Sequence, residues 1–172
     1  MIIFEKHYGL ESFIEASICQ SNTNRTINLS NFSITDKDLK RIVLVLIKTK
    51  YTFSLNLQQF TGVSSNGFCL FAGSLATNNV GRLLTSLNLS NCQSIDDESC
   101  RAIGRSFKRL NVINLNWCKV TRAGIEFILK GCRYIEELRI RNIKLGDKGM
   151  EELRMYALMT KTLKVLGMCV CE

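Results

Sequence analysis

This 172-residue sequence contains eight cysteines, whose side chains could take part in several kinds of chemistry. As thiolates they could ligate zinc or act as nucleophiles, and in an oxidising compartment they could pair as disulfides. No CxxC pair is present, which argues against zinc. Cys92 and Cys118 stand at one offset from leucine-rich segments, where Phe60 and Ile143 stand elsewhere. A position that accepts phenylalanine is a packing position, so we interpret the cysteines as small apolar core residues.

Other groups capable of catalysis are scarce in the sequence. The single histidine, His7, has no second histidine with which to share a metal or relay a proton. There is no glycine-rich phosphate loop and no GxSxG nucleophile motif. We therefore expect no catalytic residues, no metal ion and no other cofactor.

The composition indicates a globular protein. Hydrophobic residues make up 46% of the sequence and charged residues 22%, as expected of one packed domain. No apolar run approaches the roughly 20 residues that cross a membrane. The first ten residues, MIIFEKHYGL, carry no basic leader. We expect an intracellular protein, cytoplasmic or nuclear, with reduced thiols and no membrane contact.

The unit that positions these residues is a repeated strand followed by a helix. Similar tripeptides occur at residues 27–29, 55–57, 87–89, 113–115, 138–140 and 166–168, at intervals of 25 to 32 residues. Self-similarity at this period is typical of solenoids. We predict an α/β solenoid, a right-handed arc with a parallel sheet on its concave side and helices on its convex side. Residues 1–22 would form a helical cap and residues 23–172 the repeats, with strands near 26–30, 54–58, 86–90, 112–116, 137–141 and 165–169.

Two further registers support the repeat. Five residues after the start of each tripeptide stands a non-polar residue: Phe32, Phe60, Cys92, Cys118, Ile143 and Cys171. Blocks that start at positions 34, 63, 95, 120 and 145 have apolar residues at their first, sixth and ninth places, which is typical of a helix with one buried face. Four polar residues stand where helices would begin and can cap them: Thr35, Ser64, Asp96 and Thr121. Thr35 with Asp38 also resembles a capping box.

The pattern LxxLxLxxC carries a family resemblance. It is filled by Leu84, Leu87, Leu89 and Cys92, and closely by Leu110, Ile113, Leu115 and Cys118. This pattern resembles the cysteine-containing leucine-rich repeat of F-box substrate receptors and antagonist-of-mitotic-exit-network proteins, whereas residues 135–168 look more like the ribonuclease-inhibitor subtype. The resemblance implies a leucine-rich-repeat fold and, by analogy, substrate recognition together with a ubiquitin ligase. The F-box itself normally has a Leu-Pro signature, and this sequence has no proline.

The outward strand positions form a candidate binding surface. Small polar residues dominate these positions in the early repeats, and a tryptophan and three charged residues follow in the fourth and fifth. We predict a partner-binding concave face made of Asn28, Asn56, Asn88, Asn114, Asn116, Trp117, Glu137, Arg139 and Arg141. Large aromatic residues dominate binding hot spots, which favours Trp117. Two alternatives stay open: the polar residues are only solvated strand positions, and Trp117 only shields the edge of its repeat.

A basic cluster lies on and after the third and fourth predicted helices. Residues 101–172 carry 15 basic and 7 acidic residues, which accounts for the net charge of +8. The cluster consists of Arg101, Arg105, Lys108, Arg109, Lys130 and Arg133. It is either a solvated convex face or a contact for an anionic partner such as RNA, an acidic protein or tubulin tails. No aromatic residues are interleaved as base stacking would require, so specific RNA recognition is disfavoured.

Together these observations favour a non-catalytic protein-interaction scaffold or adaptor. The alternatives are a substrate-recognition module of a ubiquitin ligase and a structural subunit of a large axonemal, mitochondrial or ribosome-associated assembly. A ribonuclease-inhibitor-like blocker of a basic enzyme is disfavoured, because such an inhibitor should be acidic. The edge of the sixth strand is expected to be exposed and to pack on a partner.

Overall fold

A computed structural model describes residues 9–10, 12, 14–15, 25–30, 32–48 and 51–168 of the chain. Most of the predicted cap, together with His7, Cys19, Cys169 and Cys171, lies outside these residues. Ile14 of the predicted cap is described and is fully buried. Within the described part of the chain, no helix is long and apolar enough to cross a membrane.

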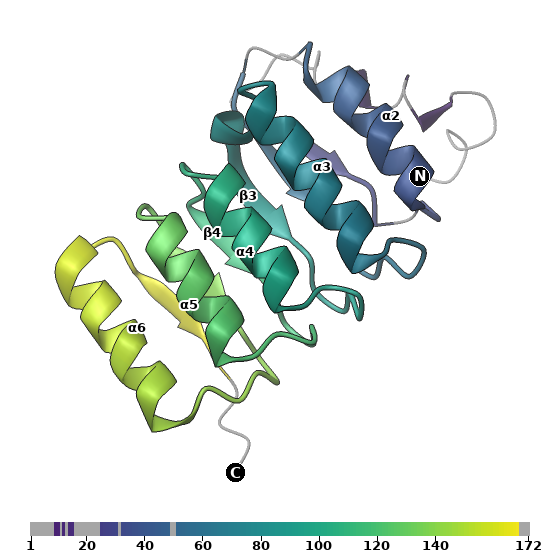
Figure 1. Ribbon diagram of the computed structural model, residues 1–172. Helices are drawn as coiled ribbons and strands as arrows, with labels where there is room; N and C mark the ends of the chain where they lie inside the picture. The colour runs from purple at the N-terminus through teal and green to yellow at the C-terminus, as the bar shows by residue number, and fades with distance from the viewer. Residues whose placement is uncertain are drawn as a thin grey trace.

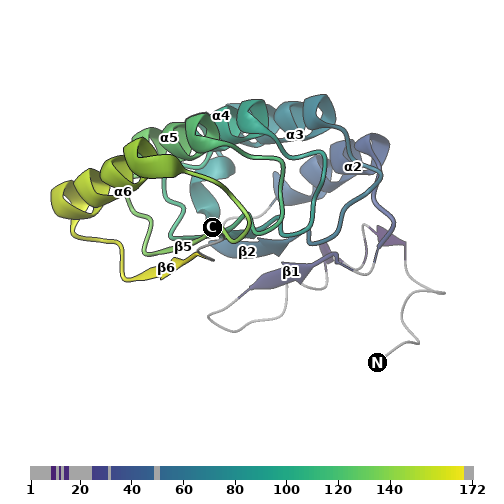
Figure 2. The same ribbon diagram turned by 90° about the horizontal axis from the view of Figure 1, so that it is seen from below.

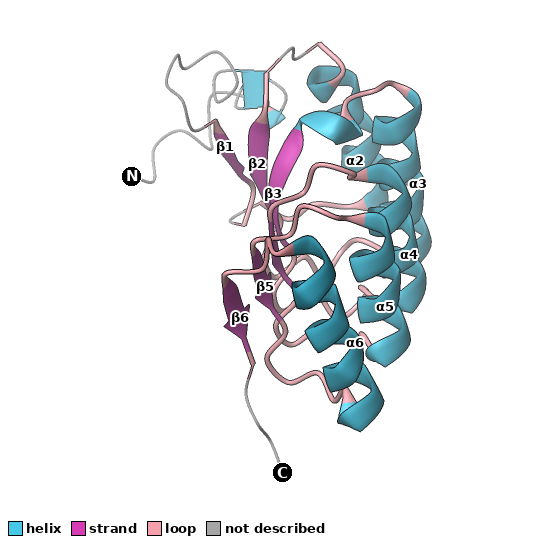
Figure 3. Cartoon of the chain, turned by 90° about the vertical axis from the view of Figure 1, so that its left-hand side faces the viewer, coloured by secondary structure: helices cyan, strands magenta, loops and turns pink. Residues whose placement is uncertain are grey.

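The architecture is a two-layer solenoid of alternating strands and helices (Figure 1). The strands are β1 (Thr26–Asn28), β2 (Phe53–Asn56), β3 (Leu84–Asn88), β4 (Val112–Asn114), β5 (Glu137–Arg139) and β6 (Val165–Gly167). The helices are α2 (Asp36–Leu46), α3 (Ser65–Thr77), α4 (Asp97–Ser106), α5 (Arg122–Gly131) and α6 (Gly146–Thr160), with the short 3-10 helix η2 (Gly81–Leu83) before β3. The helices α2 to α6 lie on one face of the sheet, as Figures 2 and 3 show from two sides. The predicted α/β solenoid is confirmed.

The sheet is parallel and its strands follow the order of the sequence, from β1 to β6. The register places Asn28, Asn56, Asn88, Asn114, Arg139 and Gly167 side by side in one row across the sheet. This row is the one that the alignment of tripeptides predicts.

The strands end about two residues earlier than the sequence predicts. At the ends of β1 to β4 an asparagine side chain, rather than a neighbouring strand, accepts the amide two residues on, as between Asn88 Oδ1 and the Ser90 amide at 3.1 Å. The following residue then turns into the left-handed region, as Asn91 does with φ 61°. This turn chemistry ends the strand and was not anticipated from the alternation of polar and apolar residues.

The core lies between the sheet and the helices. The middle residues of β1 to β5 are at most 1% exposed: Ile27, Leu55, Leu87, Ile113 and Leu138. The corresponding residue of β6, Leu166, is 39% exposed, because the described residues provide no further strand to cover it. The exposed edge predicted for the sixth strand is therefore present in the described chain.

The buried cysteines pack as core residues and also link successive repeats. The Cys92 thiol donates to the carbonyl oxygen of Leu57, and the Cys118 thiol to that of Leu89, each at 3.1 Å. Burial raises the pKa of Cys118 and of Cys132 to about 12. These thiols are protonated at neutral pH, as the interpretation of core residues requires.

The helix starts carry a second connection between repeats. All four predicted capping residues are N-caps, and the Asp38 carboxylate accepts both the amide and the hydroxyl of Thr35. Asp36, the first residue of α2, accepts the amide and the hydroxyl of Ser64 at 2.8 and 2.6 Å. Ser64 is the N-cap of the next helix, α3. Asp97 and Thr121 repeat this arrangement at the same two distances. These carboxylates hold neighbouring helix starts in register.

Candidate functional site

The concave face brings together most of the residues predicted to bind a partner. Asn28, Asn56, Asn88, Asn114 and Arg139 form one row by the strand register. Glu137 lies in the adjacent row beside Val112. Asn116, Trp117 and Arg141 follow the strands, in the loops that lead to the helices.

The asparagine row has a structural role that the sequence did not indicate. Asn28 Oδ1 accepts the Ser30 amide, the Ser30 hydroxyl and, at 3.0 Å, the side-chain amide of Asn56. Asn114 Oδ1 likewise accepts the Asn116 amide at 3.0 Å. Because these oxygens already satisfy strand-end amides, the asparagines are largely committed to the fold.

The charged residues of β5 partly neutralise each other. The guanidinium of Arg139 forms an ion pair with Glu137. A Cβ atom added to Gly167 of β6 would lie 3.2 Å from Cγ of Arg139, so the absent side chain leaves room for the arginine stem. Among the described residues, Arg141 has no side-chain partner and is exposed. Arg141 therefore contributes uncompensated positive charge at this end of the sheet.

Trp117 stands in a backbone conformation that disfavours its side chain. Four buried residues share one position after the strands: Phe60, Cys92, Cys118 and Ile143. The residue before each of them has a positive φ: 62° at Gln59, 61° at Asn91, 62° at Trp117 and 64° at Asn142. Asparagine tolerates this left-handed region, whereas a bulky side chain there costs roughly 1–2 kcal/mol. Trp117 is nevertheless 52% exposed, so about half of its surface remains accessible to a partner.

Trp117 and Arg141 are direct neighbours on adjacent loops. The Trp117 amide donates to the carbonyl oxygen of Arg141 at 3.0 Å, and the Arg141 amide donates to Asn116 Oδ1 at 2.7 Å. On the other side, the Gln93 side-chain amide donates to the Trp117 carbonyl at 2.9 Å. The backbone of Trp117 is thus held on both sides while its ring remains half exposed.

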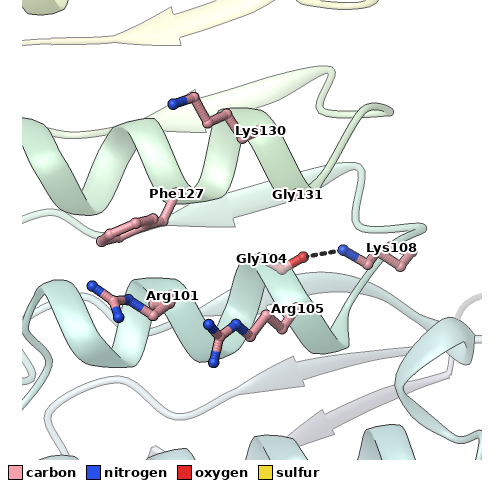
Figure 4. Close-up of a pocket in the computed structure, with 7 residues that line it drawn as sticks. All are labelled: Arg101, Gly104, Arg105, Lys108, Phe127, Lys130 and Gly131. Carbon is pink, nitrogen blue, oxygen red and sulfur yellow. Dashed lines mark hydrogen bonds between the residues drawn. The ribbon is translucent and has the colours of Figure 1, made fainter.

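The basic cluster is divided by the structure. Arg101, Arg105, Lys108 and Lys130 line a pocket of about 390 Å³ between α4 and α5, whereas Arg109 and Arg133 are exposed outside it. Figure 4 shows this groove, whose remaining lining residues are Gly104, Phe127 and Gly131.

The sequence did not single out Phe127, Gly104 or Gly131 as part of a surface. The available indication was a glycine in the interior of one amphipathic helix, where glycine is otherwise unfavourable, and another at the end of the next helix. In the structure, Gly104 and Gly131 let the two helix backbones touch. The distance between the helices, and with it the shape of the groove, follows from this contact.

Comparisons with known proteins agree with this architecture. The fold is that of a leucine-rich-repeat solenoid. A family model described as leucine-rich repeat matches residues 82–104. The C-terminal domain of tropomodulin from Caenorhabditis elegans is similar in structure, with a TM-score of 0.63 and 16% identity over 78% of this chain and 84% of that one. The actin-binding site 2 of leiomodin-1 is also similar, with a TM-score of 0.59 and 22% identity over 80% of each chain. At these identities the likeness is one of fold.

Proposed function

We propose that this chain is a non-catalytic protein-interaction module that binds a protein partner through Trp117 and Arg141 at the end of its concave sheet. The leucine-rich-repeat fold supports a role in protein recognition, since such solenoids present extended concave surfaces. No catalytic activity is expected, because the described thiols are mostly buried and protonated.

The observation that carries the proposal is the strained, half-exposed tryptophan. A conformational cost persists only when something compensates it, and such outliers cluster at functional sites. The fold does not require tryptophan here, because Asn91 and Asn142 occupy the same position with nearly the same φ. A partner that covers the ring would supply compensation, and tryptophan and arginine are both among the residues most enriched at binding hot spots.

The test uses a variant that should fold better and bind worse. Trp117→Asn introduces the residue that the neighbouring repeats have at this position. We expect it to raise the free energy of unfolding by about 1 kcal/mol relative to the wild type. Partners recovered by affinity purification and mass spectrometry should be lost from Trp117→Asn and from Arg141→Glu. Tyr134→Asn is the matched control, because Tyr134 is a comparably exposed aromatic residue at 57% and precedes β5 at the opposite end of the strands. Retention of every partner by both site variants would refute the proposal.

Actin is the first defined partner to test, because one of the similar structures is an actin-binding region. Co-sedimentation with filaments and binding to monomeric actin would each be compared between the wild type and Trp117→Asn. The purification also separates the remaining alternatives. Recovery of ubiquitin-ligase subunits would favour the substrate-recognition role, and recovery of a stoichiometric complex would favour a structural subunit. The basic residues on α4 and α5 support a second contact, with an acidic partner.

A further inference from the structure

We propose that the groove between α4 and α5 is a second binding site, which takes an acidic, extended segment of a protein partner. The groove lies between the neighbouring helices α4 and α5, whereas Trp117 lies in the loop that follows β4. The proposal therefore concerns a surface separate from the one at Trp117 and does not depend on it.

The charge of the groove is positive and only partly compensated. Among its lining residues four are cationic and none is acidic. Lys130 points away from α4 in Figure 4 and forms an ion pair with Glu126, and Arg101 is 3.3 Å from Glu98. Arg105 has no partner in the described part of the chain, and Lys108 donates only to a backbone carbonyl. Uncompensated positive charge therefore remains on the α4 side of the groove.

The spacing of the cations on α4 fits an extended chain. Arg101 and Arg105 are four residues apart on α4, so they lie along one side of the helix. Lys108 follows the end of the helix and donates to the carbonyl oxygen of Gly104. Four residues of helix rise by about 6 Å, and two residues of an extended strand span about 6.6–6.8 Å. Acidic side chains at alternate positions of an extended segment can thus meet successive cations of this row.

The walls of the groove are rigid, which reduces the cost of binding. A Cβ atom on Gly131 would overlap the backbone of Gly104, so the two helices are in direct backbone contact here. The Lys108 ammonium is held 2.6 Å from the Gly104 carbonyl oxygen at the end of α4. The Arg101 guanidinium lies over the Phe127 ring at 4.4 Å. Two of the three cations are therefore preorganised before a ligand arrives.

The same geometry disfavours nucleic acid as the occupant. Single-stranded nucleic acids bind by stacking their bases on exposed aromatic faces along a basic groove. Phe127 is the one aromatic residue among those that line this groove, and the Arg101 guanidinium already covers a face of its ring. Carboxylates need no such platform, so an acidic peptide fits the observed residues better.

The test measures binding of the full chain to a fluorescein-labelled hexaglutamate peptide by fluorescence anisotropy, at low and at physiological salt. Arg105→Glu should weaken binding by about fivefold or more, as expected for the loss of an exposed charge contact and its replacement by repulsion. Arg105→Gln should have an intermediate effect. Lys37→Glu on α2 makes the same change in net charge away from the groove and should alter the affinity less than twofold. Urea unfolding of each variant verifies that the fold is kept.

Three results would overturn the proposal. The wild type does not bind the peptide even at low salt, Lys37→Glu weakens binding as much as Arg105→Glu does, or a six-nucleotide oligouridylate binds as tightly as the peptide. The variants at Trp117 leave this groove unchanged and should keep the affinity for hexaglutamate. Failure of the Trp117 site and failure of the groove can therefore be told apart.

Discussion

The contact between α4 and α5 makes a sharp prediction about the substitution Gly131→Ala. In an ordinary helix, replacing glycine by alanine stabilises the protein by about 0.5–1 kcal/mol, because alanine loses less backbone entropy on folding. At Gly131 the added methyl group would collide with the backbone of Gly104 and would lie 2.5 Å from its carbonyl carbon. A backbone obstacle cannot rotate away as a flexible side chain can, so the helices must move apart.

The size of the effect follows from these two opposing contributions. Overpacking of a close contact costs about 1–3 kcal/mol and sometimes more, and the gain in helix propensity offsets up to about 1 kcal/mol. We expect Gly131→Ala to lower the free energy of unfolding by about 2 kcal/mol, which lowers Tm by about 4–8 °C in a chain of this length.

The matched control is Gly73→Ala on α3. Gly73 is exposed inside its helix, and a Cβ atom added there meets nothing within 4 Å. This variant should be about 0.5–1 kcal/mol more stable than the wild type. The assay is urea unfolding followed by circular dichroism, with the slope of the transition compared between variants to verify two-state behaviour. If both substitutions stabilise the protein, the close approach of α4 and α5 is refuted.

Three other predictions follow from the same contacts. Burial acts to raise the pKa of Asp96, but hydrogen bonds from the Ser99 amide and from the Ser65 and Ser99 hydroxyls outweigh it and lower the pKa. The stabilising contribution of the Asp96 carboxylate is therefore complete above about pH 4 and is lost as the pH falls further. When the free energy of unfolding is measured at several acidic pH values, Asp96→Asn should make it depend less steeply on pH. Burial raises the pKa values of Cys118 and Cys132 to about 12, so both thiols should resist iodoacetamide at pH 8 and react only after unfolding. Peptide mass spectrometry measures the labelling, and rapid labelling of the native protein would contradict their burial. Trp117→Asn should raise Tm, and a lower Tm would mean that the tryptophan ring stabilises the fold more than its backbone conformation costs.

Much of the fold was predictable because its determinants are local. The spacing of apolar residues distinguishes a strand from a helix within a few residues, and the N-caps at Ser64 and Thr121 act on amides of their own helices. The residue row from Asn28 to Arg139 was also predictable, since a constant offset within each repeat forces equivalent residues into register.

The ends of the strands were less predictable, because two interactions compete there. Asn88 and Asn114 alternate with apolar residues as strand residues do, yet their side-chain oxygens accept the amide two residues on and withdraw it from the strand pairing. Which interaction prevails depends on how the neighbouring strand is placed, and the polar and apolar pattern does not contain that information.

By itself, the sequence determined the repeat, the direction of each side chain in it and the core position of Cys92 and Cys118, because these follow from periodicity. Only the tertiary structure decided which basic residues share a groove. Arg101 and Phe127 belong to different repeats and meet because Gly104 and Gly131 allow two helix backbones to touch. The distance between two helices is set by the packing of all the residues between them, so no spacing within one repeat can specify it.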